Sequence, residues 1–203
     1  MTRYVLLAGE GKTELGGWAG HPTYRDDKPS AGVLEALLTK VATEGWEIRD
    51  AVEWKHLTRY RAHEPSLGKD ELNTRALWLH AMERKCDLIV FSRDRDRAAE
   101  RTEAVERGRR WLEAKCVGAG LGVVGGMAHE CIEAWVLALV GQARTEGLST
   151  LRAKELLKGY GLADVTRMGD SIGAADFARV PADAHSLRAW LIQARNVLNP
   201  SLP

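Results

Sequence analysis

The stretch Asp87–Arg97 constrains the fold most, because a short apolar run, Leu88–Phe91, is followed by two carboxylates one residue apart. The run is β-branched and aromatic without polar alternation, which is typical of a central strand in a parallel sheet covered on both faces. Ligands of such sheets bind beyond the carboxyl ends of the strands. Because side chains alternate along an extended segment, we expect Asp94 and Asp96 to project to the same side as paired oxygen donors.

Arginines alternate with these carboxylates. Arg93, Arg95 and Arg97 are expected on the opposite side of the extended segment, and further arginines continue to Arg110. If the carboxylates bind metal, the arginines are free to contact phosphates. The alternative is a solvated helix face with intrahelical ion pairs, and the sequence leaves both interpretations open.

Strand-like and helix-like patterns alternate along the first part of the chain. Strands are expected over Tyr4–Ala8, Trp46–Trp54, Asp87–Ser92 and Leu121–Val124, and helices over Ser30–Gly45, Asp70–Lys85, a charged segment ending near Val117–Gly118, and His129–Val140. This order predicts an α/β fold whose mainly parallel four-stranded sheet is flanked by helices.

Beyond Gly141 the strand patterns disappear. The segments Leu151–Tyr160 and Ala184–Leu198 have helical periodicity and are separated by a polar, glycine-rich segment. We therefore divide the chain into a sheet domain, residues 1–141, and a helical C-terminal extension, residues 142–203, that packs on the sheet or on a partner.

Composition narrows the classes of protein to consider. The 29 Lys and Arg residues nearly balance the 28 Asp and Glu residues, so the net charge of +1 gives no strong nucleic-acid signature. Cys86, Cys116 and Cys131 have no paired spacing, which argues for reduced thiols and against a zinc cluster or disulfide framework. No apolar run resembles a leader or a membrane span, so we expect a cytoplasmic protein without membrane contact.

Acidic residues follow several expected strands. Glu10 follows the first strand, Asp94 and Asp96 follow the third, and Glu130 and Glu133 begin the helix after the fourth. We expect these side chains at one edge of the sheet, where they would repel each other unless divalent cations neutralise them. Oxygen-only ligation suits Mg²⁺ or Mn²⁺, and a two-metal site of this kind serves phosphoryl transfer or phosphodiester hydrolysis.

With these motifs in this order, the chain resembles the Toprim domain, the Rossmann-like fold shared by primases, topoisomerases and OLD-type nucleases. Gly9–Glu14 is similar to the Glu-Gly motif of the family, and Asp94–Asp96 is similar to its Asp-x-Asp motif. Glu130–Trp135 is similar to the Glu-Ala-Trp helix of RloB-like and related Toprim proteins. The three motifs span roughly the first two thirds of the 203 residues.

The resemblance implies a Mg²⁺- or Mn²⁺-dependent nuclease acting on DNA or RNA in prokaryotic antiviral defence. It implies that Glu10 is a metal ligand or general acid–base, that Asp94 and Asp96 are catalytic metal ligands, and that Glu133 with Glu130 completes a second metal position. Helical geometry places Glu133 at the border of the apolar stripe, which favours it over Glu130. Since these 203 residues include no OLD-type ATPase domain, the alternative is a non-catalytic subunit that binds a separately encoded partner ATPase or nucleic acid.

Each acidic candidate also has a simpler interpretation. Glu10 could be an acid in a surface turn, and Glu133 could form an ion pair with a nearby arginine. Asp94 and Asp96 could complement the dipole of the following helix, which stabilises it by about 0.3–1 kcal/mol for each charge. The sequence alone leaves these alternatives open.

Lys12 and the three alternating arginines, Arg93, Arg95 and Arg97, are candidates for contact with phosphate. The alternative for Lys12 is a lysine that is solvated and binds no ligand. A P-loop is excluded because Leu6 occupies the position of its first glycine. The chain also has no nucleophile elbow and no dinucleotide-binding glycine fingerprint.

Overall fold

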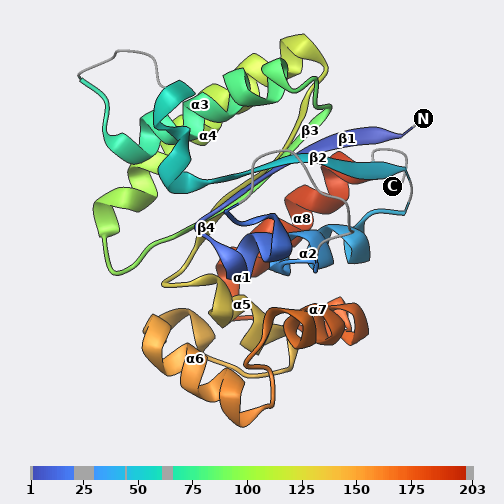
Figure 1. Cartoon of the computed structure of the whole chain (residues 1–203). Coiled ribbons are helices and arrows are strands. Elements are labelled where there is room, and N and C mark those ends of the chain that lie inside the picture. The colour runs from blue at the N-terminus through green and yellow to red at the C-terminus, as the bar shows by residue number, and fades with distance from the viewer. Residues whose placement is uncertain (1, 21–29, 44, 61–65, 200–203) are drawn as a thin grey trace.

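Four parallel strands form the centre of the protein, in the order β2-β1-β3-β4 (Figure 1). The strands are β1 (Arg3–Gly9), β2 (Trp46–Glu53), β3 (Leu88–Asp94) and β4 (Gly122–Ala128). The computed structural model describes residues 2–20, 30–43, 45–60 and 66–199. The predicted α/β class with a four-stranded parallel sheet is confirmed.

Side chains of the central strands alternate between two hydrophobic cores. In β3, Leu88 and Val90 enter the first core, while Ile89 and Phe91 enter the second. All four are completely buried, as the uninterrupted apolar run predicts for a strand covered on both faces.

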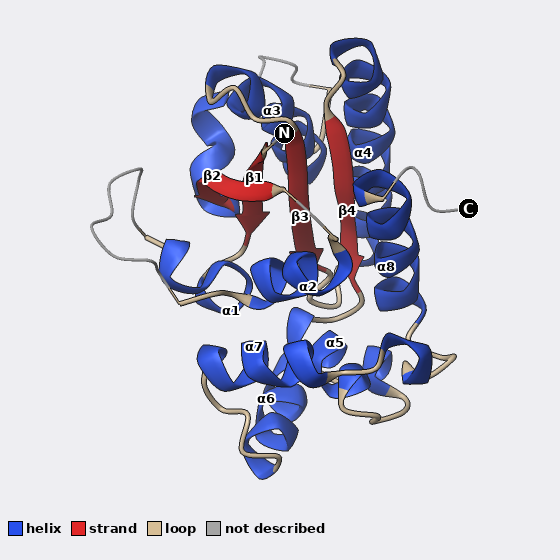
Figure 2. Cartoon of the chain, turned by 90° about the vertical axis from the view of Figure 1, so that its right-hand side faces the viewer, coloured by secondary structure: helices blue, strands red, loops and turns tan. Residues whose placement is uncertain are grey.

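Helices cover both faces of the sheet (Figures 1 and 2). The first core is closed by α2 (Val33–Val41) and α8 (His185–Leu198), and the second by α3 (Lys69–Glu83) and α4 (Ala99–Ala119). The short helix η2 (Trp54–Tyr60) extends the second core after β2. Because each sheet face is covered, ligands can reach the strands only at their ends or at an edge.

Four further helices gather at the carboxyl ends of the strands (Figure 2), namely α1 (Lys12–Leu15), α5 (Ile132–Leu139), α6 (Thr150–Gly159) and α7 (Val165–Ala174). Three short 3-10 helices are η1 (Gly16–Trp18), η3 (Thr145–Gly147) and η4 (Phe177–Arg179). In the part of the chain that the structure describes, no helix has the length and apolar character needed to cross a membrane. The three cysteines are buried free thiols.

Three local predictions differ from the structure. The helix expected from Ser30 begins at Val33, with Gly32 as its N-cap. Helix α7 lies inside the segment expected to be polar, because its buried stripe consists only of Met168 and Ile172. Strand β3 continues to Asp94 and therefore includes the first predicted ligand.

The C-terminal helices pack on the sheet domain. Leu187, Trp190 and Leu191 of α8 are buried in the same hydrophobic cluster as Val5 of β1 and Leu88 of β3. The predicted boundary after residue 141 is therefore crossed by a continuous core. The sequence left open whether these helices pack on the sheet or on a partner, and in the structure they pack on the sheet.

Candidate functional site: a buried carboxylate cluster

Asp94, the last residue of β3, occupies the carboxyl end of a central strand. Because side chains alternate along the strand, Asp94 is in phase with Leu88 and Val90 and faces the side where α1 and α5 lie. It is 7% exposed, and its carboxylate accepts a hydrogen bond from the backbone N–H of Ile132. Its Oδ1 atom has no hydrogen-bond partner among the described residues, which is costly for a buried oxygen.

Two further buried acids join Asp94. Glu14 on α1 is 4% exposed and Glu133 on α5 is 3% exposed. Glu14 accepts a hydrogen bond from the Gly11 N–H at 3.1 Å. The Oε1 atom of Glu133 accepts one from the Thr13 hydroxyl at 3.3 Å and lies 3.5 Å from Nζ of Lys154 on α6. We call Glu14, Asp94 and Glu133 the carboxylate cluster.

The carboxylate cluster is electrostatically strained. Burial, followed by repulsion from Glu14, Glu133 and Asp96, raises the pKa of Asp94 to about 9. Burial, with a further contribution from Glu133, raises the pKa of Glu14 to about 7. Buried like charges of this kind are held only with a proton or a cation among them. Lys154 is the cation that lies beside Glu133.

Glu14 was not among the predicted site residues. Its helix, α1, is a single turn with no apolar stripe, so periodicity gave no indication that the residue is buried. The available signal was its place in the motif Gly9–Glu14. The structure shows how closely Glu14 packs, because a Cβ atom at Gly9 would lie 2.5 Å from the Cβ of Glu14. Only a glycine at this position allows Glu14 to approach the end of β1.

Glu10 lies next to Asp94, but its carboxylate is engaged by an arginine. Its Oε1 accepts a hydrogen bond from the Asp94 backbone N–H at 3.1 Å and forms an ion pair with Arg93. Arg93 also pairs with Asp70 at 2.9 Å and lies over the ring of Trp54, 5.5 Å from its centroid. Arg93 therefore joins the end of β1 to helix α3.

Asp96 and Glu130 are likewise paired with arginines. Asp96 has a side chain that is 45% exposed and lies 3.0 Å from Arg101, and Glu130 forms an ion pair with Arg95. Both acids have positive φ angles, 49° and 60°. The extended alternation expected for Asp94 and Asp96 was wrong, since β3 ends at Asp94 and the left-handed turn directs Asp96 to the surface.

The four predicted phosphate contacts divide into two pairs. Arg93 and Arg95 are partly buried and engaged by carboxylates. Lys12 and Arg97 are exposed near the carboxyl ends of β1 and β3. The second pair is therefore the one available to an anionic ligand.

The acidic side chains that the structure describes do not form a ready-made metal site. Within the ranges that the structure describes, no group of three or more His, Cys, Asp or Glu side chains is placed to hold a metal ion. Within the predicted trio, Glu10 lies next to Asp94, but the carboxylates of Glu10 and Asp96 are each paired with an arginine. The carboxylate cluster nevertheless offers the oxygen-only donors that Mg²⁺ and Mn²⁺ bind, including the unpartnered Oδ1 of Asp94. Its donor chemistry fits such an ion, and ligation requires the carboxylates to close around it.

Comparisons with known proteins give no information on the function of this chain. No family model, no curated protein and no solved structure matches this chain. The Toprim resemblance therefore rests on the segments Gly9–Glu14, Asp94–Asp96 and Glu130–Trp135 alone.

Proposed function

We propose that the protein is a Toprim-type nuclease that hydrolyses phosphodiester bonds of DNA or RNA with Mg²⁺ or Mn²⁺. The carboxylate cluster is the observation that carries the proposal. Glu14, Asp94 and Glu133 come from three separate elements and converge at the carboxyl end of a parallel sheet, where ligands of such sheets bind. Three buried acids destabilise the fold, and a bound divalent cation would offset that cost.

The cluster residues would hold the metal, and Asp94 would contribute Oδ1, which has no hydrogen-bond partner in the part of the chain that the structure describes. When bound, Mg²⁺ or Mn²⁺ supplies activation of water and stabilisation of the leaving oxygen. Glu10 and Asp96, predicted as further ligands with Glu130, are adjacent and would have to exchange their arginine partners to contribute.

Other side chains have roles that need no metal contact. Lys154 places a positive charge beside Glu133 and can attract a phosphate to the cluster. The Thr13 hydroxyl orients the Glu133 carboxylate. Arg93 holds the Glu10 carboxylate against the Asp94 backbone, the position from which Glu10 would act as general acid–base. Exposed Lys12 and Arg97 would contact the nucleic-acid backbone.

A non-catalytic subunit is the second candidate function. It is favoured by the ion pairs of Glu10, Asp96 and Glu130, because three of the predicted ligands are neutralised by arginines without a metal. Such a subunit would bind nucleic acid or a separately encoded partner ATPase. For either candidate, prokaryotic antiviral defence is the setting proposed from the family resemblance.

Cleavage assays separate the two candidates. Single- and double-stranded DNA and RNA are incubated with Mg²⁺ or Mn²⁺ and with wild type, Asp94→Asn or Glu14→Gln. We expect metal-dependent cleavage that falls roughly 100-fold or more in both variants. Glu155→Gln, which changes an exposed acid on α6, is the matched control and should cleave as wild type does. Absence of cleavage with every substrate, together with no calorimetric binding of either metal, would overturn the enzyme proposal.

A further inference from the structure

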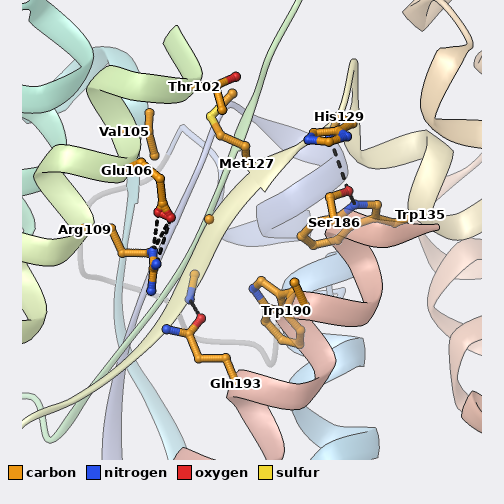
Figure 3. A pocket seen from close by; sticks show the side chains of 13 residues that line it. Thr102, Val105, Glu106, Arg109, Met127, His129, Trp135, Ser186, Trp190 and Gln193 are labelled. Carbon is orange, nitrogen blue, oxygen red and sulfur yellow. Dashed lines mark hydrogen bonds and ion pairs between the residues drawn. The ribbon is translucent and has the colours of Figure 1, made fainter. Parts of the chain in front are cut away.

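A cavity of about 320 Å³ lies at the outer edge of β4, between α4 and α8 (Figure 3). Strand β4 is last in the sheet order, so β3 is its only strand neighbour among the described residues. Figure 3 shows Glu106 and Arg109 of α4 on one side of the strand, with Trp190 and Gln193 of α8 on the other. The volume is at the lower end of the range of roughly 300–1,000 Å³ for small-molecule sites, which is room for a ring-sized group.

The backbone of β4 presents alternate residues to this edge. Gly122 donates its N–H to the Asp87 carbonyl on the β3 side, so odd-numbered residues of β4 direct their N–H and C=O groups outward. Helix α8 satisfies two outward N–H groups, one in β4 and one in the residue that follows it. The Gly125 N–H donates to the Gln193 side chain at 2.9 Å, and the His129 N–H donates to the Ser186 hydroxyl at 3.4 Å.

Met127 lies between these two satisfied positions. The residue of α8 midway between Ser186 and Gln193 is Ala189, whose side chain ends at Cβ and offers no polar atom. Among residues that the structure describes, no side chain or loop backbone is hydrogen-bonded to Met127. The N–H and C=O of Met127 therefore stand side by side at the cavity without a partner among the described residues.

Gly126 keeps the cavity open. A Cβ atom at Gly126 would meet no atom within 4 Å, whereas one at Gly125 would run into the ring of Phe91. Packing thus explains the glycine at 125 but not the glycine at 126. The missing side chain leaves space beside the free edge groups of Met127.

The walls of the cavity include two tryptophans whose polar atoms are already satisfied. The indole N–H of Trp190 donates to the Phe91 carbonyl, and that of Trp135 donates to the Ser186 hydroxyl. Their ring centroids lie 6.0 Å apart. Aromatic walls combined with one adjacent donor–acceptor pair suit a planar heteroaromatic ring with complementary groups on one edge.

We propose that this cavity binds one unpaired nucleobase of a nucleic-acid substrate, whose edge pairs with the N–H and C=O of Met127. The inference rests on the proposed nuclease function. Its location supports the link, because Ala128, the neighbour of Met127, pairs in register with Asp94 of the carboxylate cluster. A nucleotide whose phosphate lies at the cluster would have a base within reach of the cavity. The substrate class is then single-stranded nucleic acid, or a duplex with an extruded base.

The test measures binding of free nucleosides, which needs no cleavage. Adenosine, guanosine, cytidine and uridine are titrated by calorimetry, and tryptophan indole N–H signals are followed by NMR. We expect saturable binding of at least one nucleoside with a shift of an indole signal. Gly126→Leu, which fills the cavity, and Ala189→Gln, which offers Met127 a side-chain partner, should each weaken binding at least roughly 10-fold, the size of one lost bidentate base contact.

Matched controls change the same residue types elsewhere. Gly118→Leu on α4 adds a side chain where no atom lies within 4 Å, and Ile192→Gln changes an α8 residue that is 56% exposed. Both should bind nucleosides as wild type does. Circular dichroism verifies the fold of each variant, and the two cavity variants test the site independently, so a folding failure in one leaves the other decisive.

The inference is overturned if no nucleoside saturates the wild-type protein, if both cavity variants bind as wild type does, or if short extended peptides bind in place of nucleosides. Its failure is distinguishable from that of the proposed function. Cleavage without nucleoside binding would remove the nucleobase site alone. Nucleoside binding that survives in Asp94→Asn, with no cleavage by wild type, would remove the nuclease proposal alone.

Discussion

The Thr13 hydroxyl on α1 donates a hydrogen bond to the Glu133 carboxylate on α5 at 3.3 Å, although the two residues are 120 positions apart. The bond joins the loop after β1 to the helix after β4. It brings Glu133 to the same site as Glu14 and Asp94, whose pKa values both respond to its charge. The site is therefore a product of tertiary packing at the carboxyl end of the sheet.

Replacing Asp94 should stabilise the metal-free protein. Burial and neighbouring acids raise the pKa of Asp94 from 3.8 to about 9. As the pH rises above 3.8, the unfolded chain releases this proton while the folded protein retains it, so the free energy of unfolding falls until about pH 9. Asp94→Asn removes this loss. At pH 8 we expect urea denaturation to show a free energy of unfolding higher than that of wild type by on the order of 1–3 kcal/mol.

The gain from Asp94→Asn should shrink when the measurement is repeated at pH 4, where both states of the wild type bind the proton. Glu155→Gln on the exposed face of α6 is the control and should stay within about 0.5 kcal/mol of wild type at both pH values. A destabilised Asp94→Asn variant at pH 8 would contradict the strain described for the cluster.

Divalent cations should stabilise the wild-type protein. At a free concentration 100 times the dissociation constant, Mn²⁺ or Mg²⁺ should add about 2.7 kcal/mol to the free energy of unfolding. Thermal denaturation with and without chelator measures the shift, and Glu133→Gln should reduce it strongly because one buried carboxylate is lost. An equal shift in wild type and Glu133→Gln would place the cation elsewhere.

Arg93 should contribute to stability through its two carboxylate partners. Arg93→Leu removes the cation that Glu10 and Asp70 share. We expect urea denaturation to show a free energy of unfolding lower than that of wild type by about 1–3 kcal/mol. Arg97→Leu removes an exposed arginine from the same segment and should change stability by less than about 0.5 kcal/mol. If the double variant Arg93→Leu/Glu10→Gln is no more stable than Arg93→Leu, the two residues are not coupled.

Glu146 should make stability depend on acid pH. Its own burial would raise its pKa, but hydrogen bonds from His129 and Ser186 outweigh burial and lower it from 4.5 to about 2. The stabilisation is complete above pH 4.5 and is lost as the pH falls toward 2. Glu146→Gln should therefore cost on the order of 1–2 kcal/mol at pH 7, and the difference from wild type should narrow below pH 4.5. A difference that is independent of pH would contradict this origin.

The C-terminal helices should be required for folding of the sheet. Deleting residues 142–203 removes α8, whose Trp190 and Leu191 lie in the core that includes Val5. We expect residues 1–141 alone to show no cooperative thermal transition. Trp190→Ala in the full chain should cost about 3–5 kcal/mol, whereas Ile192→Ala at an exposed position serves as the control. A cooperatively folded 1–141 fragment would support the predicted division into two domains.

Local sequence patterns were sufficient to predict the sheet and the edge that holds the candidate site. The uninterrupted run Leu88–Phe91 identified a doubly covered strand, and Asp94 stands at its end as expected. Helical spacing favoured Glu133, which is buried at the site. Both results follow from periodicity, which reflects burial over neighbouring residues and needs no knowledge of distant contacts.

The sequence by itself determined the parallel α/β architecture and the positions of Asp94 and Glu133 at the ends of its elements. Only the tertiary structure decided which acids face one another: it buried Glu14 with them and paired Glu10 and Asp96 with arginines. The physical reason is that strand and helix propensity act over a few residues, whereas the partner of a charge depends on turns and on segments far apart in the chain.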